Sequence, residues 1–422
     1  MRFDYGKLSP RVEKLDNGIP VYLFPDPALD LVRLDFIFDA GSYFQRKPLQ
    51  AGACCALTGA GTERYSADRL SEEMDFYGAY MERYSDRDQA FITFYSLSRY
   101  FSDILPFCEE AVKRSVFPQS ELDTYLRKQH SKFLVNLQKV AHVARRAFYP
   151  ALFGRNHPYG VVLEEDDFKR LTREDLQTFY KTFYNSENCC IVLSGSYGKE
   201  HLQMLNRLFG AEDWKGEKVT LQEVTPLREV PAGISSPLYV SQRGSLQEAL
   251  MTGMRIMPVS DPGFAPFKVV DYILGGYFGS RLMRNIREDK GYTYGISSFV
   301  LPLRFSPVWM ISSEVKGGCA DKVLKEIEKE IRKLQKKEVD MHELELVRHA
   351  YMGEFMHELD GIFDIAERMK FFLSAGVDAD FYRKQEEVLF SITPSQIKEY
   401  AGRFLNMENF TTVIVGGERE NM

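Results

Sequence analysis

The chain has 422 residues, of which 44% are hydrophobic and 27% are charged, and its formal net charge is −6. These values are typical of a soluble globular protein of two or three domains, and the negative balance gives no reason to expect nucleic acid as a partner. No apolar run approaches the roughly 20 residues that span a bilayer, and the start MRFDYGKLSP lacks the apolar region of a signal peptide. The six cysteines include two adjacent pairs and do not have the spacing of a secreted disulfide framework, so the sequence predicts a cytoplasmic protein.

The first half of the chain begins with predicted strands. LDNGIPVYLFP carries an Asn17-Gly18 turn that leads into one strand. In the next strand apolar residues alternate with other residues, which is the period of a half-buried strand; the apolar positions are Val32, Leu34, Phe36 and Phe38. Helices are predicted over 65–78, 101–115 and 119–149.

A long internal repeat relates the two halves of the chain. LTREDLQTFYKTFYNSENCCIVLSG (171–195) aligns without a gap to ITPSQIKEYAGRFLNMENFTTVIVG (392–416), a shift of 221 residues. Each copy predicts a helix capped by threonine, a turn with two asparagines, and a buried strand that ends at a glycine. A shift near half of the chain length predicts two homologous halves rather than a solenoid of short repeats.

The segment 213–237 is rich in Pro, Gly and charge, so we interpret it as the linker between an N-terminal domain (1–212) and a C-terminal domain (238–422). The second half is also predicted to contain both strands and helices. The strands are expected near 238–243, 248–256 and 293–301, and the helices near 262–288, 319–336, 340–357 and 361–374. Strand-rich ends around helical middles predict α+β halves, each a mostly antiparallel sheet covered by helices.

The run LGGYFGSRLMRNIREDKGYTYGISS (274–298) places Arg287 and Tyr294 seven residues apart, with Gly291 between them where a helix C-cap is expected. This run resembles the C-terminal-half motif of the M16 metallopeptidases, the family of pitrilysin, mitochondrial processing peptidase and insulinase. In that family an Arg and a Tyr at this spacing hold the carbonyl group of the peptide being cut. A phenol O–H and a guanidinium beside that oxygen stabilise the negative charge that gathers on it when water attacks. The resemblance therefore implies a catalytic and substrate-binding role for Arg287 and Tyr294.

Blocks of the N-terminal half follow one another as in an M16 domain, so the resemblance covers nearly the whole chain. The blocks are KLDNGIPVYLFPD, FIFDAGSYFQ, GAGTERYSADRLSEEMDFYGA, ALFGRNHPYG and the 171–195 segment. The family implies the LuxS/MPP-like metallohydrolase fold, in which two such double domains close like a clam around a peptide. This chain corresponds to one side of that clam.

The zinc site of the family is lost in this sequence. An active member carries His-x-x-Glu-His on the helix before a Gly-Thr pair, here Gly61-Thr62, because two histidines one turn apart share a zinc ion and the glutamate activates water. Those five places hold Gly52, Ala53, Cys54, Cys55 and Ala56. The third ligand should be a glutamate about 75 residues further on, but no acidic residue occurs between Asp123 and Glu164. Glu82 and Arg83 also replace the Asn-Ala pattern of the strand that faces the substrate.

Other residues offer weak substitutes for the lost site. His342, His349 and His357 are more simply explained as partly exposed helix residues than as zinc ligands. Cys54 and Cys55 point in different directions on a helix, and no spacing supports a thiol nucleophile with His130 or His142 as its base. We therefore expect small buried cysteines and no metal or cofactor in this chain.

Three functional hypotheses remain open at this point. The leading one is the non-zinc subunit of a heterodimeric M16-type peptidase, in which the partner supplies zinc, the His-x-x-Glu-His motif and the Glu ligand for peptide hydrolysis. The second is a non-catalytic M16-like scaffold or peptide-binding protein. The third is an enzyme with unfamiliar thiol chemistry at Cys54 or Cys55. None of the three involves nucleic acid or a membrane.

Overall fold

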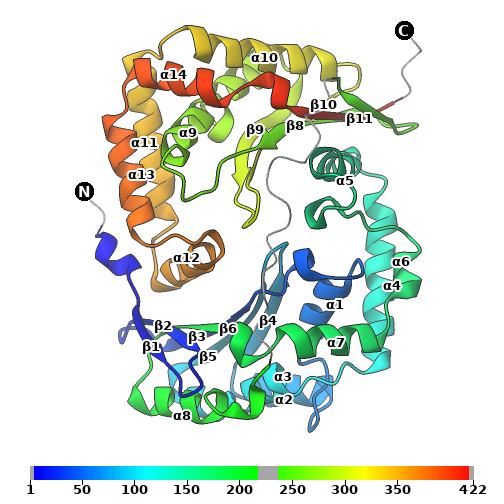
Figure 1. Ribbon diagram of the computed structural model, residues 1–422, viewed down its shortest axis with the longest axis vertical. Coiled ribbons are helices and arrows are strands. Elements are labelled where there is room, and N and C mark those ends of the chain that lie inside the picture. Colours follow the sequence, from blue (N-terminus) through cyan, green and yellow to red (C-terminus); the bar gives the residue numbers. More distant parts are fainter. Residues whose placement is uncertain (1–3, 217–235, 418–422) are drawn as a thin grey trace.

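The computed structural model describes residues 4–216 and 236–417 and contains two sheets at opposite ends of the molecule (Figure 1). The first sheet has the strand order β1-β2-β6-β3-β5-β4, and the second has the order β7-β11-β8-β10-β9. Within each sheet one pair of neighbours is parallel, β2 with β6 and β7 with β11, and the other pairs are antiparallel. The strands are β1 Arg11–Lys14, β2 Pro20–Pro25, β3 Leu31–Phe38, β4 Tyr80–Ser85, β5 Ala90–Leu97, β6 Cys189–Gly195, β7 Leu238–Ser241, β8 Gln247–Arg255, β9 Thr293–Leu301, β10 Val308–Lys316 and β11 Thr411–Gly416.

Once β1 is set aside, the two sheets have the same strand order. The parallel pair is β2–β6 in the first sheet and β7–β11 in the second, and β3, β5 and β4 of the first sheet correspond to β8, β10 and β9 of the second. The repeated segments form α7 (Arg173–Phe183) with β6 and α14 (Pro394–Phe404) with β11. Both helices begin with a capping box, in which Thr172 or Thr393 accepts a hydrogen bond from the backbone N–H three residues later. The predicted fold class, α+β with mostly antiparallel sheets, is confirmed.

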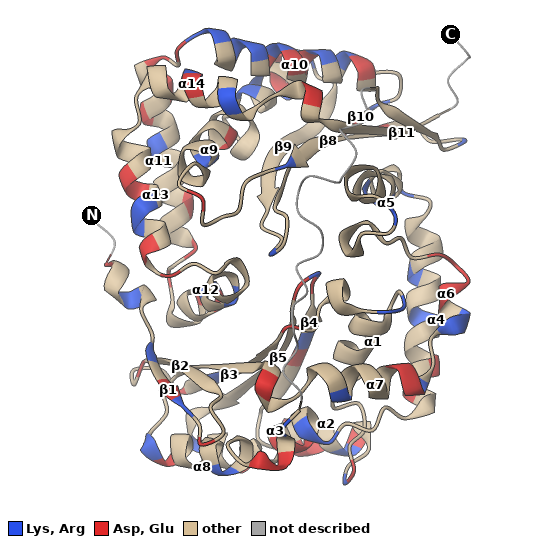
Figure 2. Ribbon diagram, viewed as in Figure 1, with Lys and Arg blue, Asp and Glu red and all other residues tan. Residues whose placement is uncertain are grey.

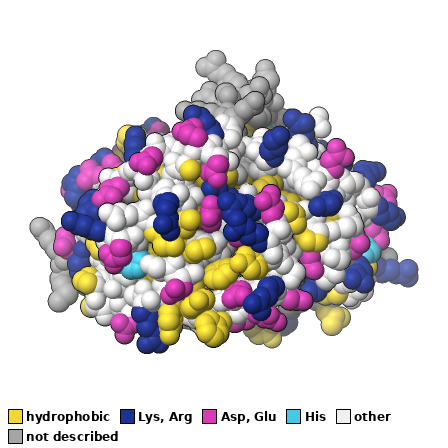
Figure 3. Space-filling model, turned by 90° about the horizontal axis from the view of Figure 1, so that it is seen from below, with side chains coloured by type: hydrophobic (Ala, Val, Ile, Leu, Met, Phe, Trp, Pro, Cys, Tyr) yellow, Lys and Arg dark blue, Asp and Glu magenta, His cyan; other side chains and the backbone are white. Residues whose placement is uncertain are grey.

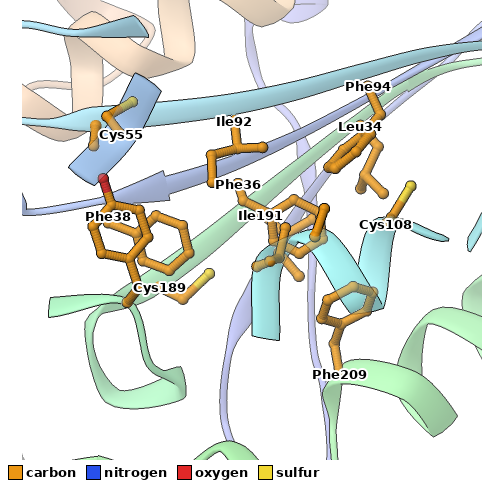
Figure 4. Packing of buried hydrophobic residues seen from close by; sticks show 14 of the residues in the cluster. Leu34, Phe36, Phe38, Cys55, Ile92, Phe94, Cys108, Cys189, Ile191 and Phe209 are labelled. Atoms are coloured by element: carbon orange, nitrogen blue, oxygen red, sulfur yellow. The ribbon is translucent and has the colours of Figure 1, made fainter. Parts of the chain in front are cut away.

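Each sheet packs one face against helices of its own half. The helices of the first half are α1 Gln50–Leu57, α2 Ala67–Phe76, α3 Phe101–Lys113, α4 Gln119–Asn136, α5 Val140–Phe153, α6 Asp167–Arg170, α7 and α8 Lys199–Phe209. Those of the second half are α9 Phe264–Asp271, α10 Ala320–Lys336, α11 Met341–His357, α12 Ile362–Ala375, α13 Asp380–Ser391 and α14. The first core joins the inward side chains of β3 and β5 to those of α1, α3, α7 and α8 (Figure 4).

The other face of each sheet is covered by a helix from the opposite half. Helix α5 packs on β8 and β11 of the second sheet, and α12 packs on β2 and β6 of the first sheet, so both helices lie between the sheets (Figure 1). Phe148 of α5 is completely buried in a cluster with Met251, Met310 and Val413. Burial of this kind contributes about 25 cal/mol per Å² of apolar surface. The halves are therefore joined by two reciprocal helix contacts as well as by the chain.

The exchange of helices corrects the prediction that β3 is half-buried. Seven of its eight residues are buried, including Arg33 and Asp35 on the face turned away from the first core. Arg33 donates a hydrogen bond to Asp35 at 2.9 Å and is paired with Glu367 of α12. Lys370 of α12 lies 3.3 Å from Asp35. Apolar and polar side chains do alternate along β3, but charged side chains of α12, and not water, contact its polar face.

Two predicted long helices are each interrupted. The prediction 119–149 corresponds to α4 and α5, because the chain turns at 137–139 to carry α5 over to the second sheet. The prediction 262–288 corresponds to α9, followed by π-helical stretches η7 (Tyr272–Gly276) and η8 (Met283–Asp289). Gly275 lies so close to β9 that an added Cβ would be 2.7 Å from the Ser298 hydroxyl. The approach of this segment to β9 therefore needs a residue without a side chain.

Most of the predicted linker, residues 217–235, lies outside the described residues. Just before it, Trp214 is buried in the first core and donates a hydrogen bond to the Tyr184 carbonyl at 2.9 Å. Within the described ranges, no helix has the length and apolar character required to span a bilayer. Seen from below, acidic, basic and apolar side chains are interspersed over the outer face of the first half (Figure 3). Neither sign of charge dominates that face.

Candidate functional site

The Arg287–Tyr294 segment is built from the π-helical stretch η8 and the first residues of the edge strand β9. Gly291 has φ +62° and its N–H donates to the Arg287 carbonyl at 3.2 Å, so the predicted glycine cap is present. Helix η8 packs along β9, and Ile286 is completely buried beneath it. Arg287 and Tyr294 thus lie on either side of one short turn at the rim of the second sheet. π-helical turns occur often at functional sites.

A β-bulge determines the direction of the Tyr294 side chain. Ser313 of β10 pairs with Ile296, and Val315 pairs with Thr293, so Tyr294 and Gly295 together oppose the single residue between them on β10. The Thr293 hydroxyl donates to the Glu314 carbonyl at 2.6 Å, and this hydrogen bond links the two strands at the bulge. Tyr294 is 92% exposed. The bulge therefore turns this tyrosine away from the packed face, as bulges beside active sites commonly do.

Arg287 differs from its two arginine neighbours in having no carboxylate partner among the described residues. Arg281 and Arg284 both bind Glu343, at 2.7 Å and 3.0 Å. The Arg287 guanidinium lies over the ring of Phe278, 4.5 Å from its centroid, and that ring is itself 66% exposed. A cation held against an aromatic face keeps its N–H donors available in the plane of the guanidinium. The guanidinium of Arg287 and the hydroxyl of Tyr294 can thus both donate hydrogen bonds to a ligand.

The positions of the lost zinc site lie on α1, which packs against the core face of the first sheet. Gly52 and Ala56 share one face of this helix and are partly buried, and Cys55 is fully buried. The hydroxyl of Tyr125, from α4, lies 3.5 Å from the place of a Gly52 Cβ. A larger side chain from residue 52 would meet that tyrosine. Small residues on α1 and a tyrosine on α4 therefore occupy the space between the two helices.

The two adjacent cysteines are buried packing residues, as predicted. The Cys54 thiol faces the Leu176 carbonyl at 3.9 Å, and the Cys55 thiol faces the Phe91 carbonyl at 3.8 Å, so they point toward α7 and β5 respectively. Figure 4 shows Cys55 among the apolar side chains of the first core. Burial raises the pKa of Cys55 to about 11 and that of Cys54 well above its usual value. Both thiols are therefore protonated at neutral pH and are poor nucleophiles.

The substrate-facing strand of the family corresponds here to β4, an edge strand of the first sheet. Arg83 of this strand donates a hydrogen bond to the Thr58 carbonyl at 2.8 Å, so it caps the C-terminal end of α1. Glu82 is exposed. One of the two residues that replace the Asn-Ala pattern, Arg83, is thus hydrogen-bonded to the end of α1, the helix that carries the degenerate zinc positions.

The histidines are dispersed. His342, His349 and His357 are exposed on α11, as predicted for helix surface residues. The His130 Nε2 atom lies within hydrogen-bond distance of a Glu165 carboxylate oxygen, at 3.1 Å, and His142 lies on α5. Among residues 4–216 and 236–417, no group of three His, Cys, Asp or Glu side chains is arranged to hold a metal ion.

Comparisons with known proteins find similarity to M16 peptidases. A family model described as "Peptidase M16 inactive domain" matches residues 170–351. A crystal structure of a peptidase M16 inactive domain from Pseudomonas fluorescens superposes with a TM-score of 0.87 at 21% identity, covering 98% of this chain and 99% of that one. Residues 170–351 are therefore similar to the M16 inactive domain, and the chain shares the fold of that solved structure.

Two curated relatives illustrate the range of this M16 similarity. An "Uncharacterized zinc protease" of Rickettsia bellii (strain RML369-C) is 22% identical over 356 residues, which are 80% of this chain and 81% of that protein. The "Probable mitochondrial-processing peptidase subunit beta, mitochondrial" of Arabidopsis thaliana is 25% identical over 209 residues, which are 47% of this chain and 38% of that protein. The fold is shared over the full chain, while sequence identity is low throughout.

The M16 family implies zinc, and the residues of this chain do not fit that ion. Tetrahedral zinc sites need imidazole, thiolate or carboxylate donors that converge on one point. Gly52 and Ala56 provide no donor atom, and the Cys55 thiol points into the core toward β5. The facing helix α4 presents Tyr125 and, beyond Asp123, no acidic residue. This chain therefore has no zinc-ligating side chain at residues 52 and 56 and no carboxylate at residue 55, the place of the water-activating base.

The burial of the cysteines gives a testable prediction. With a pKa of about 11, Cys55 is roughly 0.1% thiolate at pH 8, and the thiolate is the reactive form. We expect iodoacetamide to modify Cys54 and Cys55 at least about 100-fold more slowly in the native chain than in guanidinium. Peptide mapping by mass spectrometry at pH 8 measures this, with the partly exposed Cys319 as an internal comparison. If Cys55 reacted as fast as Cys319 in the native protein, the assignment as a buried packing residue would be wrong.

Proposed function

We propose that this chain is the non-zinc subunit of a two-chain M16-type peptidase, and that Arg287 and Tyr294 complete the active site of a zinc-bearing partner. The observation that carries the proposal is that the hydrogen-bond donors of both side chains are available to a substrate. Tyr294 is 92% exposed on a bulge of an edge strand, and Arg287 has no carboxylate partner among the described residues, although the arginines at 281 and 284 have one. Side chains kept only for packing would not be presented in this way.

The chemistry of the pair suits peptide hydrolysis. When water attacks a peptide carbonyl, negative charge develops on the oxygen, and a phenol O–H together with a guanidinium stabilises it. Arg287 can also hold a neighbouring carbonyl through its fork of donors. The partner would supply zinc, the His-x-x-Glu-His motif, the Glu ligand and the base; the sequence of this chain contains no His-x-x-Glu-His. The similarity to a protein named as one subunit of a processing peptidase supports a two-chain assembly.

The edge position of β9 supports the same role. β9 pairs with β10 on one side, and no strand of the described chain pairs with its other side. The free N–H and C=O groups of an edge strand can bind an extended peptide as an additional strand. A peptide bound along β9 would lie beside Tyr294 at the bulge. A cytoplasmic location and the absence of a cofactor in this chain are parts of the same proposal.

Capture of the tagged chain from its native cells, followed by mass spectrometry and zinc analysis, tests the proposal. We expect a stoichiometric partner with His-x-x-Glu-His and about one zinc ion per complex. Tagged chain with Arg287→Ala should capture the same partner in the same amount, since the pair acts on substrate and not on assembly. A chain that returns alone and metal-free would contradict the proposal and favour the non-catalytic scaffold or peptide-binding protein.

A further inference from the structure

A stretch of 40 residues, 124–163, contains seven lysines and arginines and no acidic residue, in a chain whose net charge is −6. It forms most of α4, all of α5 and the segment that follows. The missing acidic zinc ligand accounts for one position at most. Figure 2 shows basic residues on α4 and α5. The one-sided charge of this stretch therefore needs a separate explanation.

These two helices and the segment 161–168 enclose a cavity of about 270 Å³, which we call the basic cavity. Its charged and titratable lining residues are Arg87, Lys132, His142, Arg145 and Arg146. No acidic side chain of the described chain lines it. Cations gathered around a cavity whose lining contains no acidic side chain favour the binding of an anion.

The fold satisfies two of the four fixed cations and leaves the other two unpaired. Arg87 donates to the Tyr159 carbonyl at 2.9 Å and lies over the Tyr149 ring at 3.8 Å. Arg146 is paired with Glu164. Lys132 and Arg145 have no ion pair or hydrogen bond within the described ranges, and both side chains are exposed. These two can therefore reach a ligand in the cavity without giving up a partner.

The lowered pKa of His142 is consistent with an excess of positive charge around the cavity. Burial lowers the pKa of this imidazole, and the nearby charges of Arg145, Arg146 and Lys139 lower it further. A neutral imidazole on the wall can donate one hydrogen bond to an anionic oxygen.

The rest of the lining is apolar, so the ligand must combine an anion with an apolar group. The apolar lining residues include Leu49, Phe133, Tyr149, Val161 and Phe168. The cavity is slightly smaller than the ~300–1,000 Å³ of sites that enclose a drug-sized ligand, so it has room for the end of a chain. The last residue of a peptide fits both requirements, because its carboxylate and its side chain leave the same Cα. An aspartate or glutamate side chain brings the carboxylate without the apolar group.

We propose that the basic cavity binds the C-terminal residue of a peptide, with the terminal carboxylate between Lys132 and Arg145 and an apolar side chain against Phe133 and Phe168. The cavity also includes Leu49, next to the first residue of α1, and Gln129 of α4, so it lies beside the helix that carries the degenerate zinc positions. Binding needs only this chain and does not depend on a zinc-bearing partner.

Fluorescence anisotropy with the full chain and labelled pentapeptides that end in leucine tests this assignment. The free acid should bind at least about tenfold more tightly than the amide of the same sequence, since hydrogen bonds to charged groups contribute about 1.5–3 kcal/mol. This preference should disappear in Lys132→Met/Arg145→Met. The matched control Lys128→Met/Arg155→Met removes the same charge from the same stretch at exposed positions outside the cavity, and it should keep the preference.

Three results would overturn the proposal. One is equal affinity for acid and amide, or no binding of either peptide. Another is a preference for the acid that survives in Lys132→Met/Arg145→Met. The third is an amidated peptide with a penultimate glutamate that binds as well as the leucine acid, since it would reassign the cavity to side-chain carboxylates. Circular dichroism of each variant checks folding, and substitutions at these exposed positions should leave it unchanged.

Discussion

Tyr294→Phe is expected to lower the turnover number of the assembled peptidase by roughly 10²–10³, because it removes one donor to the developing oxyanion and nothing else. Tyr294 is 92% exposed, so the fold of this chain should not change. Arg287→Ala should lower turnover by a similar factor and also raise KM, because the guanidinium can hold a neighbouring carbonyl as well. Steady-state hydrolysis of a quenched peptide by the complex measures both effects.

Arg284→Ala is the matched control for these variants. Arg284 lies on the same π-helical stretch, one turn before Arg287, and binds Glu343 at 3.0 Å. Its loss removes the same charge from the same helix and should leave turnover within about twofold. The affinity between subunits should be unchanged in all three variants. Full activity of Tyr294→Phe and Arg287→Ala in a zinc-bearing complex would place the chain with the M16-like scaffolds.

Phe148→Ala is expected to destabilise the whole chain by about 3–5 kcal/mol, the usual cost of truncating a fully buried phenylalanine. Phe148 belongs to α5 of the first half, yet it is buried against β8, β10 and β11 of the second. The cavity left behind would open at the contact between the halves. We therefore expect both halves to unfold at a lower denaturant concentration in one shifted transition.

Leu134→Ala provides the comparison for Phe148→Ala. Leu134 is on the neighbouring helix α4 and is 41% exposed, so its truncation should change stability by no more than about 0.5 kcal/mol. Urea unfolding followed by tryptophan fluorescence is informative because Trp214 is buried in the first half and Trp309 in the second. If only one half responded to Phe148→Ala, α5 would not join the two halves energetically.

Much of the architecture was predictable because the same helix caps and turn residues occur in both halves of the chain. Thr172 and Thr393 begin equivalent helices, and Asn185 and Asn406 each accept a hydrogen bond from the backbone N–H two residues later in equivalent turns. Short-range patterns of this kind are set by capping and turn chemistry and can be read from sequence. The strand prediction 293–301 coincides with β9 for the same reason.

The exchange of helices was not predictable, because nothing local distinguishes α5 and α12 from helices that stay in their own half. The clue was available in β3, where Arg33 and Asp35 occupy the polar face of an alternating strand. Two opposite charges on one face fit water as well as they fit Glu367 and Lys370 on a helix more than 300 residues away. A sequence pattern gives the period of a strand but not what covers its second face.

The geometry of the candidate site could be predicted only in part. The sequence places Arg287 and Tyr294 on either side of a glycine turn, but the bulge that exposes Tyr294 depends on the register between β9 and β10. The basic cavity was hidden for a similar reason. The sequence showed that 124–163 lacks acids, yet only the packing of α5 beside α4 brings Lys132 and Arg145 around one cavity.

Peptide hydrolysis by the reconstituted pair tests the central claim most directly. The purified chain, its purified zinc-bearing partner and an equimolar mixture of the two would be assayed with the same peptide substrate and the same total zinc. The account predicts almost no turnover by either protein alone, full turnover by the mixture, and loss of that turnover when the chain carries Tyr294→Phe with Arg287→Ala. Equal turnover by the partner with and without this chain would contradict it.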